Sequence, residues 1–244
     1  MIFYWIIFFV LFFLALPKGS KVQSKCFYFG SILLLFLGAT RGDNVGMDIN
    51  GYSIAYSHIS LDTKTWNQWM LFEPGFNFMM ALYKKYISVV PLSFFHFIFI
   101  VYIVITAWFF KQYTKFPAFA LFLLYGLTYY LDAYNTMRQS LGLALCLISF
   151  PMFLSKKKYI KFAISIVVIS LLFHKSLLLL LLFIPCDIYR ESKFFSFKYM
   201  SIFVVAALII GIFLTSAVGN YLVTIGQYVS NERYNGYVTD INEI

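Results

Sequence analysis

Charged residues are scarce in this chain. Only 12% of its 244 residues are Asp, Glu, Lys or Arg, whereas 61% are hydrophobic and the mean hydropathy is +0.80. A soluble domain carries charge on about a quarter of its residues, so this composition excludes an ordinary soluble protein. The apolar runs are long and unbroken, which excludes a transmembrane β-barrel of short alternating segments. The sequence therefore predicts an all-α polytopic membrane protein.

The sequence also has little that would indicate a metal centre or a common catalytic motif. Its three cysteines, Cys26, Cys146 and Cys186, are not at metal-ligand spacing and lie in or beside apolar runs, which favours a packing role. No G-x-S-x-G, Walker, H-E-x-x-H or C-x-x-C motif is present. We therefore expect neither a metal nor a cofactor. The net charge of +9 does not indicate nucleic acid, because the lysines lie in short loops between apolar runs.

The apolar runs predict about eight transmembrane helices in a single integral membrane domain, residues 1–244. The first run has no charged leading region and no small-residue cleavage site, so it reads as a retained span. The two runs that flank His174 are short for spans of about 20 residues, which leaves a re-entrant element open as an alternative. The eight runs cover residues 2–16, 26–39, 90–110, 116–131, 137–154, 160–173, 177–185 and 199–214.

The distribution of basic residues predicts the orientation. The loops at 17–25, 111–115, 155–161 and 187–198 hold 12 of the 19 Lys and Arg residues but only two of the 10 acidic ones. Positively charged loops stay on the cytoplasmic side, which places the N-terminus outside. One long loop, at about 41–89, then lies on the outer side, as does a turn at His174. Every unusual polar residue discussed below falls on this outer side.

Two arginines at outer span ends are candidate anion-binding residues. On a continuous helix Asn135, Arg138, Gln139 and Gly142 would share one face, and such polar groups at the mouth of two spans mark functional sites. Guanidinium groups bind phosphate oxygens in a bidentate manner, so we interpret Arg138 and Arg41 as a pyrophosphate clamp. The alternative is that both side chains extend to lipid headgroups.

Three further residues could take or give a proton in this outer region. Asp48 ends a glycine-containing polar stretch, and its alternative role is to form a turn. Glu73 follows Trp66 and Trp69, which also suit an interfacial segment without catalysis. His174 interrupts an apolar stretch, where a packed core histidine is the alternative.

These residues occur in an order that resembles the EpsG family, bacterial membrane proteins associated with exopolysaccharide and capsule synthesis. The family is similar in role to the Wzy-type O-antigen polymerases. The matching elements are Arg-Gly-x-x-x-Gly-x-Asp at 41–48, Tyr52, Glu73-Pro74-Gly75, Met137-Arg138-Gln139 and Phe173-His174-Lys175-Ser176. The resemblance runs from the N-terminus to the end of the last predicted span. Family members usually continue through further spans, so we expect the chain to be incomplete at its C-terminus.

The resemblance implies a glycosyltransferase of the bacterial plasma membrane that polymerises lipid-linked oligosaccharide repeat units at the outer leaflet. Its substrate would be carried on undecaprenyl pyrophosphate, and its partners would be the lipid bilayer and other polysaccharide-assembly membrane proteins. Arg41, Arg138, Gln139 and Asn135 would bind the substrate, and Glu73, Asp48 or His174 would act as the base. Inverting and retaining transfer both stay open.

Three other functions are compatible with the sequence. A membrane O-acyltransferase that modifies surface glycans would also use an outer or mid-membrane histidine. A non-catalytic subunit of a synthesis complex is a second alternative. A transporter or flippase ranks lowest, because the chain has no internal repeat and its predicted inner loops carry little except basic residues.

Overall fold

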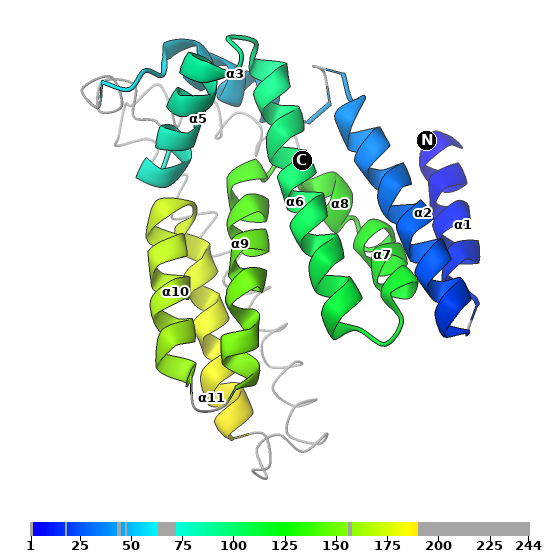
Figure 1. The fold of residues 1–244 in the computed structure, drawn as a ribbon. Helices are drawn as coiled ribbons and strands as arrows, with labels where there is room; N and C mark the ends of the chain where they lie inside the picture. The colour runs from blue at the N-terminus through cyan, green and yellow to red at the C-terminus, as the bar shows by residue number, and fades with distance from the viewer. Residues whose placement is uncertain are drawn as a thin grey trace, which may run out of the picture. The chain divides into compact units, whose positions relative to one another are not determined.

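The computed structural model describes residues 2–17, 19–42, 45–46, 48–62, 72–155 and 158–189, and the regular secondary structure of these residues is helical (Figure 1). The elements in chain order are α1 (Ile2–Ala15), α2 (Ser20–Ala39), α3 (Ile49–His58), α5 (Pro74–Tyr86), α6 (Pro91–Tyr113), α7 (Pro117–Gly126), α8 (Tyr129–Asp132), α9 (Met137–Leu154), α10 (Tyr159–Leu172), the 3-10 helix η2 (Lys175–Leu182) and α11 (Phe183–Ile188).

Three of these helices are long and apolar enough to cross a membrane. They are Lys21–Ala39 within α2, all of α6 and all of α9, and the shorter helices α1, α7 and α10 are also apolar. The chain is therefore a helical membrane protein. The number of eight crossings and the orientation stay predictions, and the apolar run at 199–214 lies outside the described residues.

The chain divides into two compact units, Met1–Ile184 and Pro185–Ile244. The site described below lies entirely in the first unit. The prediction of one integral membrane domain stays a prediction, because most of the second unit lies outside the described residues.

The long helix α6 is the centre of the first unit. It packs against α9 on one side and α2 on the other, while α10 packs on α9 and α1 packs on α2 and α7. Prolines at the first turn of α6 and α7 start both helices, because proline fixes φ and lacks an N–H that the first turn does not need. Most of the buried residues are aliphatic or aromatic. The buried polar ones are spread over α2, α5, α6, α9 and α10 and the segment just after α2, namely Gln23, Ser31, Arg41, Asn77, Thr106, Ser149 and Ser170.

Two predicted elements differ from the structure. The segment 41–89 is no continuous loop, because it contains α3 and α5. The run at 116–131 is no continuous helix, because α7 ends at Gly126 and Thr128 adopts a left-handed conformation with φ of 65° before α8 begins. At 1.5 Å per residue α7 is only about 15 Å long, which is half of a membrane core.

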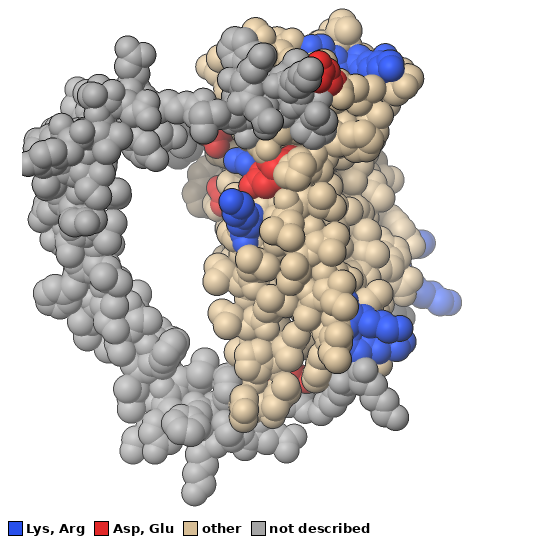
Figure 2. All heavy atoms as spheres, turned by 90° about the vertical axis from the view of Figure 1, so that its left-hand side faces the viewer, with Lys and Arg blue, Asp and Glu red and all other residues tan. Residues whose placement is uncertain are grey.

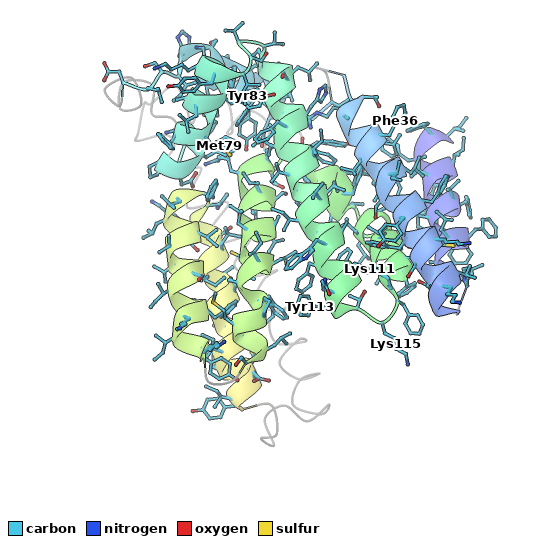
Figure 3. The ribbon with its side chains drawn as sticks, viewed as in Figure 1. Phe36, Met79, Tyr83, Lys111, Tyr113 and Lys115 are labelled. Atoms are coloured by element: carbon cyan, nitrogen blue, oxygen red, sulfur yellow. The ribbon has the colours of Figure 1, made fainter. Side chains whose placement is uncertain are left out.

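The start of α2 and the end of α6, which border two of the predicted inner loops, lie at the same end of these helices. Lys111 Nζ donates a hydrogen bond to Ser24 Oγ at 2.6 Å, which joins the start of α2 to the end of α6. Figure 3 places Lys111 and Lys115 at this end of α6 and Tyr83 of α5 at the opposite end. On the side that carries α5 and α10, an uncharged band separates a mixed group of charges near α5 from a mainly basic group at the other end (Figure 2). The alternation of inner and outer loops and the identity of the outer end stay predictions.

Candidate functional site

The Arg138 and Glu73 side chains form an ion pair at the end of the molecule where α5 and α9 begin. The Nη1 and Oε2 atoms are 2.5 Å apart, and the two side chains are 24% and 15% exposed. Glu73 directly precedes the proline that starts α5, and its carboxylate caps no helix N–H but turns to Arg138. The pairing joins residues 65 positions apart in the chain.

Aromatic residues surround this pair. The Arg138 guanidinium lies over the Phe72 ring at 4.3 Å from its centroid, a cation–π arrangement. Its Nε donates to Tyr52 Oη at 3.4 Å, and the Tyr52 and Phe72 rings are 4.9 Å apart. Sequence reasoning did not identify Phe72, and Tyr52 entered only through the family resemblance. The guanidinium is held by a carboxylate, a phenol and a ring face at once.

Asn77 fixes the backbone that carries Glu73. The Asn77 side chain accepts a hydrogen bond from Phe72 N at 3.1 Å and donates one to Phe72 O at 2.7 Å. Asn77 is 3% exposed and lies one turn into α5. The Asn77 amide thus satisfies both the N–H and the carbonyl group of Phe72, as a second backbone segment would. These two hydrogen bonds orient Phe72, which immediately precedes Glu73. The sequence signal for this role is an asparagine between two phenylalanines, Phe76 and Phe78.

Arg41 lies in a different setting. It follows α2, is only 6% exposed, and its Nε, Nη1 and Nη2 atoms have no hydrogen-bond partner among the described residues. Its guanidinium lies 4.7 Å from the Tyr134 ring centroid and 5.9 Å from that of Phe95. His96 Nε2 is hydrogen-bonded to the Arg41 carbonyl at 3.0 Å, which fixes the backbone. Burial lowers the pKa of Arg41, because desolvation disfavours the charged form.

A cavity of about 280 Å³ opens beside Arg41. Hydroxyl groups are prominent in its lining, which includes Tyr4, Thr40, Tyr125, Tyr130 and Tyr134. Tyr134 Oη donates to Tyr130 Oη at 3.1 Å, and Tyr130 Oη donates to Leu34 O at 2.7 Å. The cavity therefore combines one buried cation with an ordered set of phenols.

Gly46 allows the chain after Arg41 to return to this cavity wall. Its φ is +115°, a conformation that L side chains rarely adopt. A Cβ at this position would stand 3.1 Å from both the Tyr134 carbonyl oxygen and Asn135 Oδ1. The second glycine of the predicted Arg-Gly-x-x-x-Gly-x-Asp element is thus required by backbone geometry and by close approach.

The structure does not place Asn135 and Gln139 with Arg138. Helix α9 begins at Met137, so Asn135 lies in the preceding turn and not on the helix face. Asn135 and Gln139 line another cavity, of about 550 Å³, between α6 and α9. Gly142 contacts neither cavity, since a Cβ there would meet Leu177 and Phe173.

Asp48 and His174 lie outside the Arg138–Glu73 pair. The Asp48 side chain is exposed and does not cap α3, although its carbonyl accepts the Tyr52 N–H. His174 precedes η2, and its Nδ1 accepts from Ser176 N at 3.2 Å and lies 3.1 Å from Ser176 Oγ. The imidazole therefore caps its own turn.

The two arginines do not form one clamp in this structure. Arg41 contacts the Phe95 ring, the Phe95 ring lies 6.3 Å from that of Tyr52, and Tyr52 contacts Arg138. Aromatic side chains thus connect two cationic positions with different surroundings. Within the described part of the chain, no group of three or more His, Cys, Asp or Glu residues could hold a metal ion.

Comparison with known proteins gives one match. The family model described as EpsG family matches residues 25–243, a range that includes all seven candidate site residues. A search among curated proteins found no match, and a search among solved structures also found none.

Proposed function

We propose, on the premise that the chain belongs to the EpsG family of membrane proteins linked to exopolysaccharide synthesis, that it joins lipid-linked oligosaccharide repeat units. The donor is a glycan on undecaprenyl pyrophosphate, and the reaction takes place at the outer leaflet of a bacterial plasma membrane. The family supports the role in polysaccharide synthesis. The glycosyl transfer itself is our inference from the two arginine positions.

The observation that carries the proposal is the buried guanidinium of Arg41, which has no hydrogen-bond partner among the residues that the structure describes. A buried cation without a hydrogen-bond partner is costly, and a bound anion offsets that cost. A diphosphate supplies several oxygens in a geometry that a guanidinium fork matches. Tyr4, Tyr130 and Tyr134 line the same cavity. The Tyr130 and Tyr134 hydroxyls already donate to Leu34 O and to Tyr130 Oη. The Arg41 guanidinium therefore supplies the charge-assisted donors for the ligand. A pyrophosphate group anchored in the membrane by its lipid reaches such a site directly.

The proposed reaction uses the two positions for different steps. A hydroxyl oxygen of the acceptor glycan attacks the anomeric carbon of the donor, whose bond to the phosphate oxygen breaks. The lipid pyrophosphate departs with the bonding electrons, and Arg41 stabilises its charge. The acceptor hydroxyl proton passes to Glu73, which Arg138 orients. Glu73 is a better candidate base than Asp48, whose side chain is exposed, or His174, whose Nδ1 accepts a hydrogen bond from Ser176 N.

The polymer made by cells that carry Arg41→Met tests the proposal. We expect chains longer than one repeat unit to fall by roughly 100-fold, the cost of removing a group that stabilises developing charge. The lipid-linked single repeat unit should accumulate. Arg41→Lys is the matched control, because it keeps the charge but not the planar fork, and it should recover only part of the polymer.

The outcome distinguishes the proposal from its alternatives. Full-length polymer at normal protein level in the Arg41→Met cells would refute the role of Arg41. Unchanged chain length with altered acetyl content would indicate an O-acyltransferase instead. Loss of polymer in Arg41→Met cells but normal polymer in Glu73→Gln cells would retain the donor site and exclude Glu73 as the base.

A further inference from the structure

The cavity between α6 and α9 has a different character from the cavity beside Arg41. Its volume is about 550 Å³, and we call it the α6–α9 groove. The segment from Tyr129 to Thr136 separates the two cavities: Tyr130 and Tyr134 line the one beside Arg41, while Tyr129 and Asp132 line the groove. The groove contains neither Arg41 nor Arg138, so the proposed transfer reaction does not use it.

The groove runs along two candidate membrane spans. On α6 its lining extends from Tyr102 to Phe110, and on α9 from Gln139 to Leu147. Each stretch advances eight residues, which is about 12 Å along a helix. Because α6 and α9 are both long and apolar enough to cross a membrane, the groove lies parallel to the direction of lipid chains.

The two ends of the groove differ in chemistry. Near the start of α9 its lining is polar, with Asp132, Asn135 and Gln139. Further along α9 the lining is apolar, with Leu143 and Leu147. A ligand with one polar end and one apolar end matches this gradient, because each part then avoids an unfavourable transfer.

The charge of the lining restricts the polar end of that ligand. Among the described residues that line the groove there is no Lys, Arg or His, and Asp132 is the one carboxylate. Phosphate or carboxylate headgroups would therefore meet a like charge without a compensating cation. Hydroxyl groups suit this end, because the Asp132 carboxylate accepts hydrogen bonds and the side-chain amides of Asn135 and Gln139 both accept and donate them.

We propose that the α6–α9 groove binds one hydrocarbon chain of an uncharged, hydroxyl-bearing lipid. Leu143 is 39% exposed and Tyr129 is 60% exposed, so the groove is open to the surroundings along one side. A chain can enter from the bilayer through this side, with its head beside Asn135. The inference does not depend on polymerase activity.

Photocrosslinking of the purified full chain tests the inference. The probes are diacylglycerol and phosphatidylglycerol that carry the same diazirine-labelled chain, each added to the protein in detergent. We expect the diacylglycerol label on peptides of α6 and α9 that line the groove, at several times the yield of the anionic probe. The labelled peptides are mapped in the wild-type protein, so this result does not depend on whether a variant folds.

A pair of variants on one helix adds a matched control. Leu147→Trp fills the groove and should reduce the label on its peptides about fivefold, because close-packed space excludes the chain. Ile148→Trp changes the neighbouring residue, which is 50% exposed and does not line the groove, and should leave the label unchanged.

Three outcomes would overturn the inference. They are equal label on every exposed apolar helix, preference for the anionic probe, and an unchanged label in the Leu147→Trp variant. Less label on the groove peptides than on the other exposed helices would overturn it as well, and is the result expected if another segment of this chain occupies the groove. Each result is independent of the polymer assay, so failure here and failure of the proposed function can be told apart.

Discussion

Arg41 and Arg138 are connected through the same aromatic side chains, yet their charges are balanced in opposite ways. Arg138 is paired with Glu73 and contacts Tyr52 and the Phe72 ring. Arg41 is more deeply buried, and within the described part of the chain its guanidinium lies against ring faces and a cavity without a hydrogen-bond partner. The fold itself supplies the counter-charge of Arg138, which is Glu73. For Arg41 we expect a bound ligand to supply the counter-charge.

From this difference in charge balance we infer different roles for the two arginines: Arg138 positions Glu73, and Arg41 binds a ligand. A paired arginine contributes to the stability of the folded chain, and removal of one partner leaves the other charge exposed to an apolar environment. An unpaired buried arginine costs stability and is retained where it binds something. Stability measurements on the two positions can therefore confirm or refute the distinction without any knowledge of the substrate.

The largest effect is expected for Arg138→Met. The Glu73 carboxylate, only 15% exposed, would lose its cation, which should lower the free energy of unfolding by about 3 kcal/mol. Thermal unfolding of the purified protein in detergent measures this. If the midpoint stays at the wild-type value, the ion pair does not hold α5 to α9.

Whereas Arg138→Met lowers the free energy of unfolding, Arg41→Met should leave it unchanged or raise it. It removes the desolvation cost of the buried cation, about 1 to 3 kcal/mol for an unsatisfied buried group. It also removes the cation–π attraction to Tyr134, which is up to about 2 kcal/mol. We expect a net change between zero and a gain of about 1 kcal/mol. A loss as large as that in Arg138→Met would show that Arg41 has a structural partner and would remove the contrast.

A double-mutant cycle measures the coupling of each arginine to Glu73. The pair Glu73→Gln and Arg138→Met should show a coupling energy of about 1 to 2 kcal/mol, because the two side chains are in direct contact. The pair Glu73→Gln and Arg41→Met should be additive within about 0.5 kcal/mol. Equal coupling in both cycles would mean that the two positions form one electrostatic unit.

The smallest effect is expected for Thr128→Gly. Thr128 has φ of 65°, and a left-handed conformation costs an L residue about 1 to 2 kcal/mol. Glycine removes that cost, so the unfolding midpoint should rise while Arg138→Met remains destabilising to the same extent. A fall in stability would indicate that the Thr128 hydroxyl bond to Asp132 outweighs the backbone strain.

Long apolar runs predicted most of the helices, because burial in lipid imposes a strong compositional constraint. Span 137–154 agrees with α9 at both ends, and 90–110 agrees closely with α6. The shorter α7 was not predictable from hydropathy, since Leu127, Tyr129 and Tyr130 continue the apolar pattern while Thr128 turns the backbone. The helices α3 and α5 were missed because they are polar enough to read as a loop.

The candidate site was predictable as a set of residues but not as an arrangement. Arg41, Glu73 and Arg138 each stood out as polar groups beside apolar runs. Their different partners depend on contacts between residues far apart in the chain, such as Glu73 with Arg138. The placement of Asn135 away from Arg138 depends on where α9 begins, and helix ends are set by local backbone geometry that periodicity does not resolve.

The surroundings of Arg41 also bear on how the protein is made. Tyr134, the ring nearest its guanidinium, is encoded 93 residues later in the chain. At about 5 to 20 residues per second, the ribosome needs roughly 5 to 20 seconds to deliver it. Until then the arginine lacks the ring that lies nearest to its guanidinium, and an interfacial position in contact with water is favourable for it. Burial of Arg41 is therefore a late step in membrane assembly, after α9 has begun to emerge.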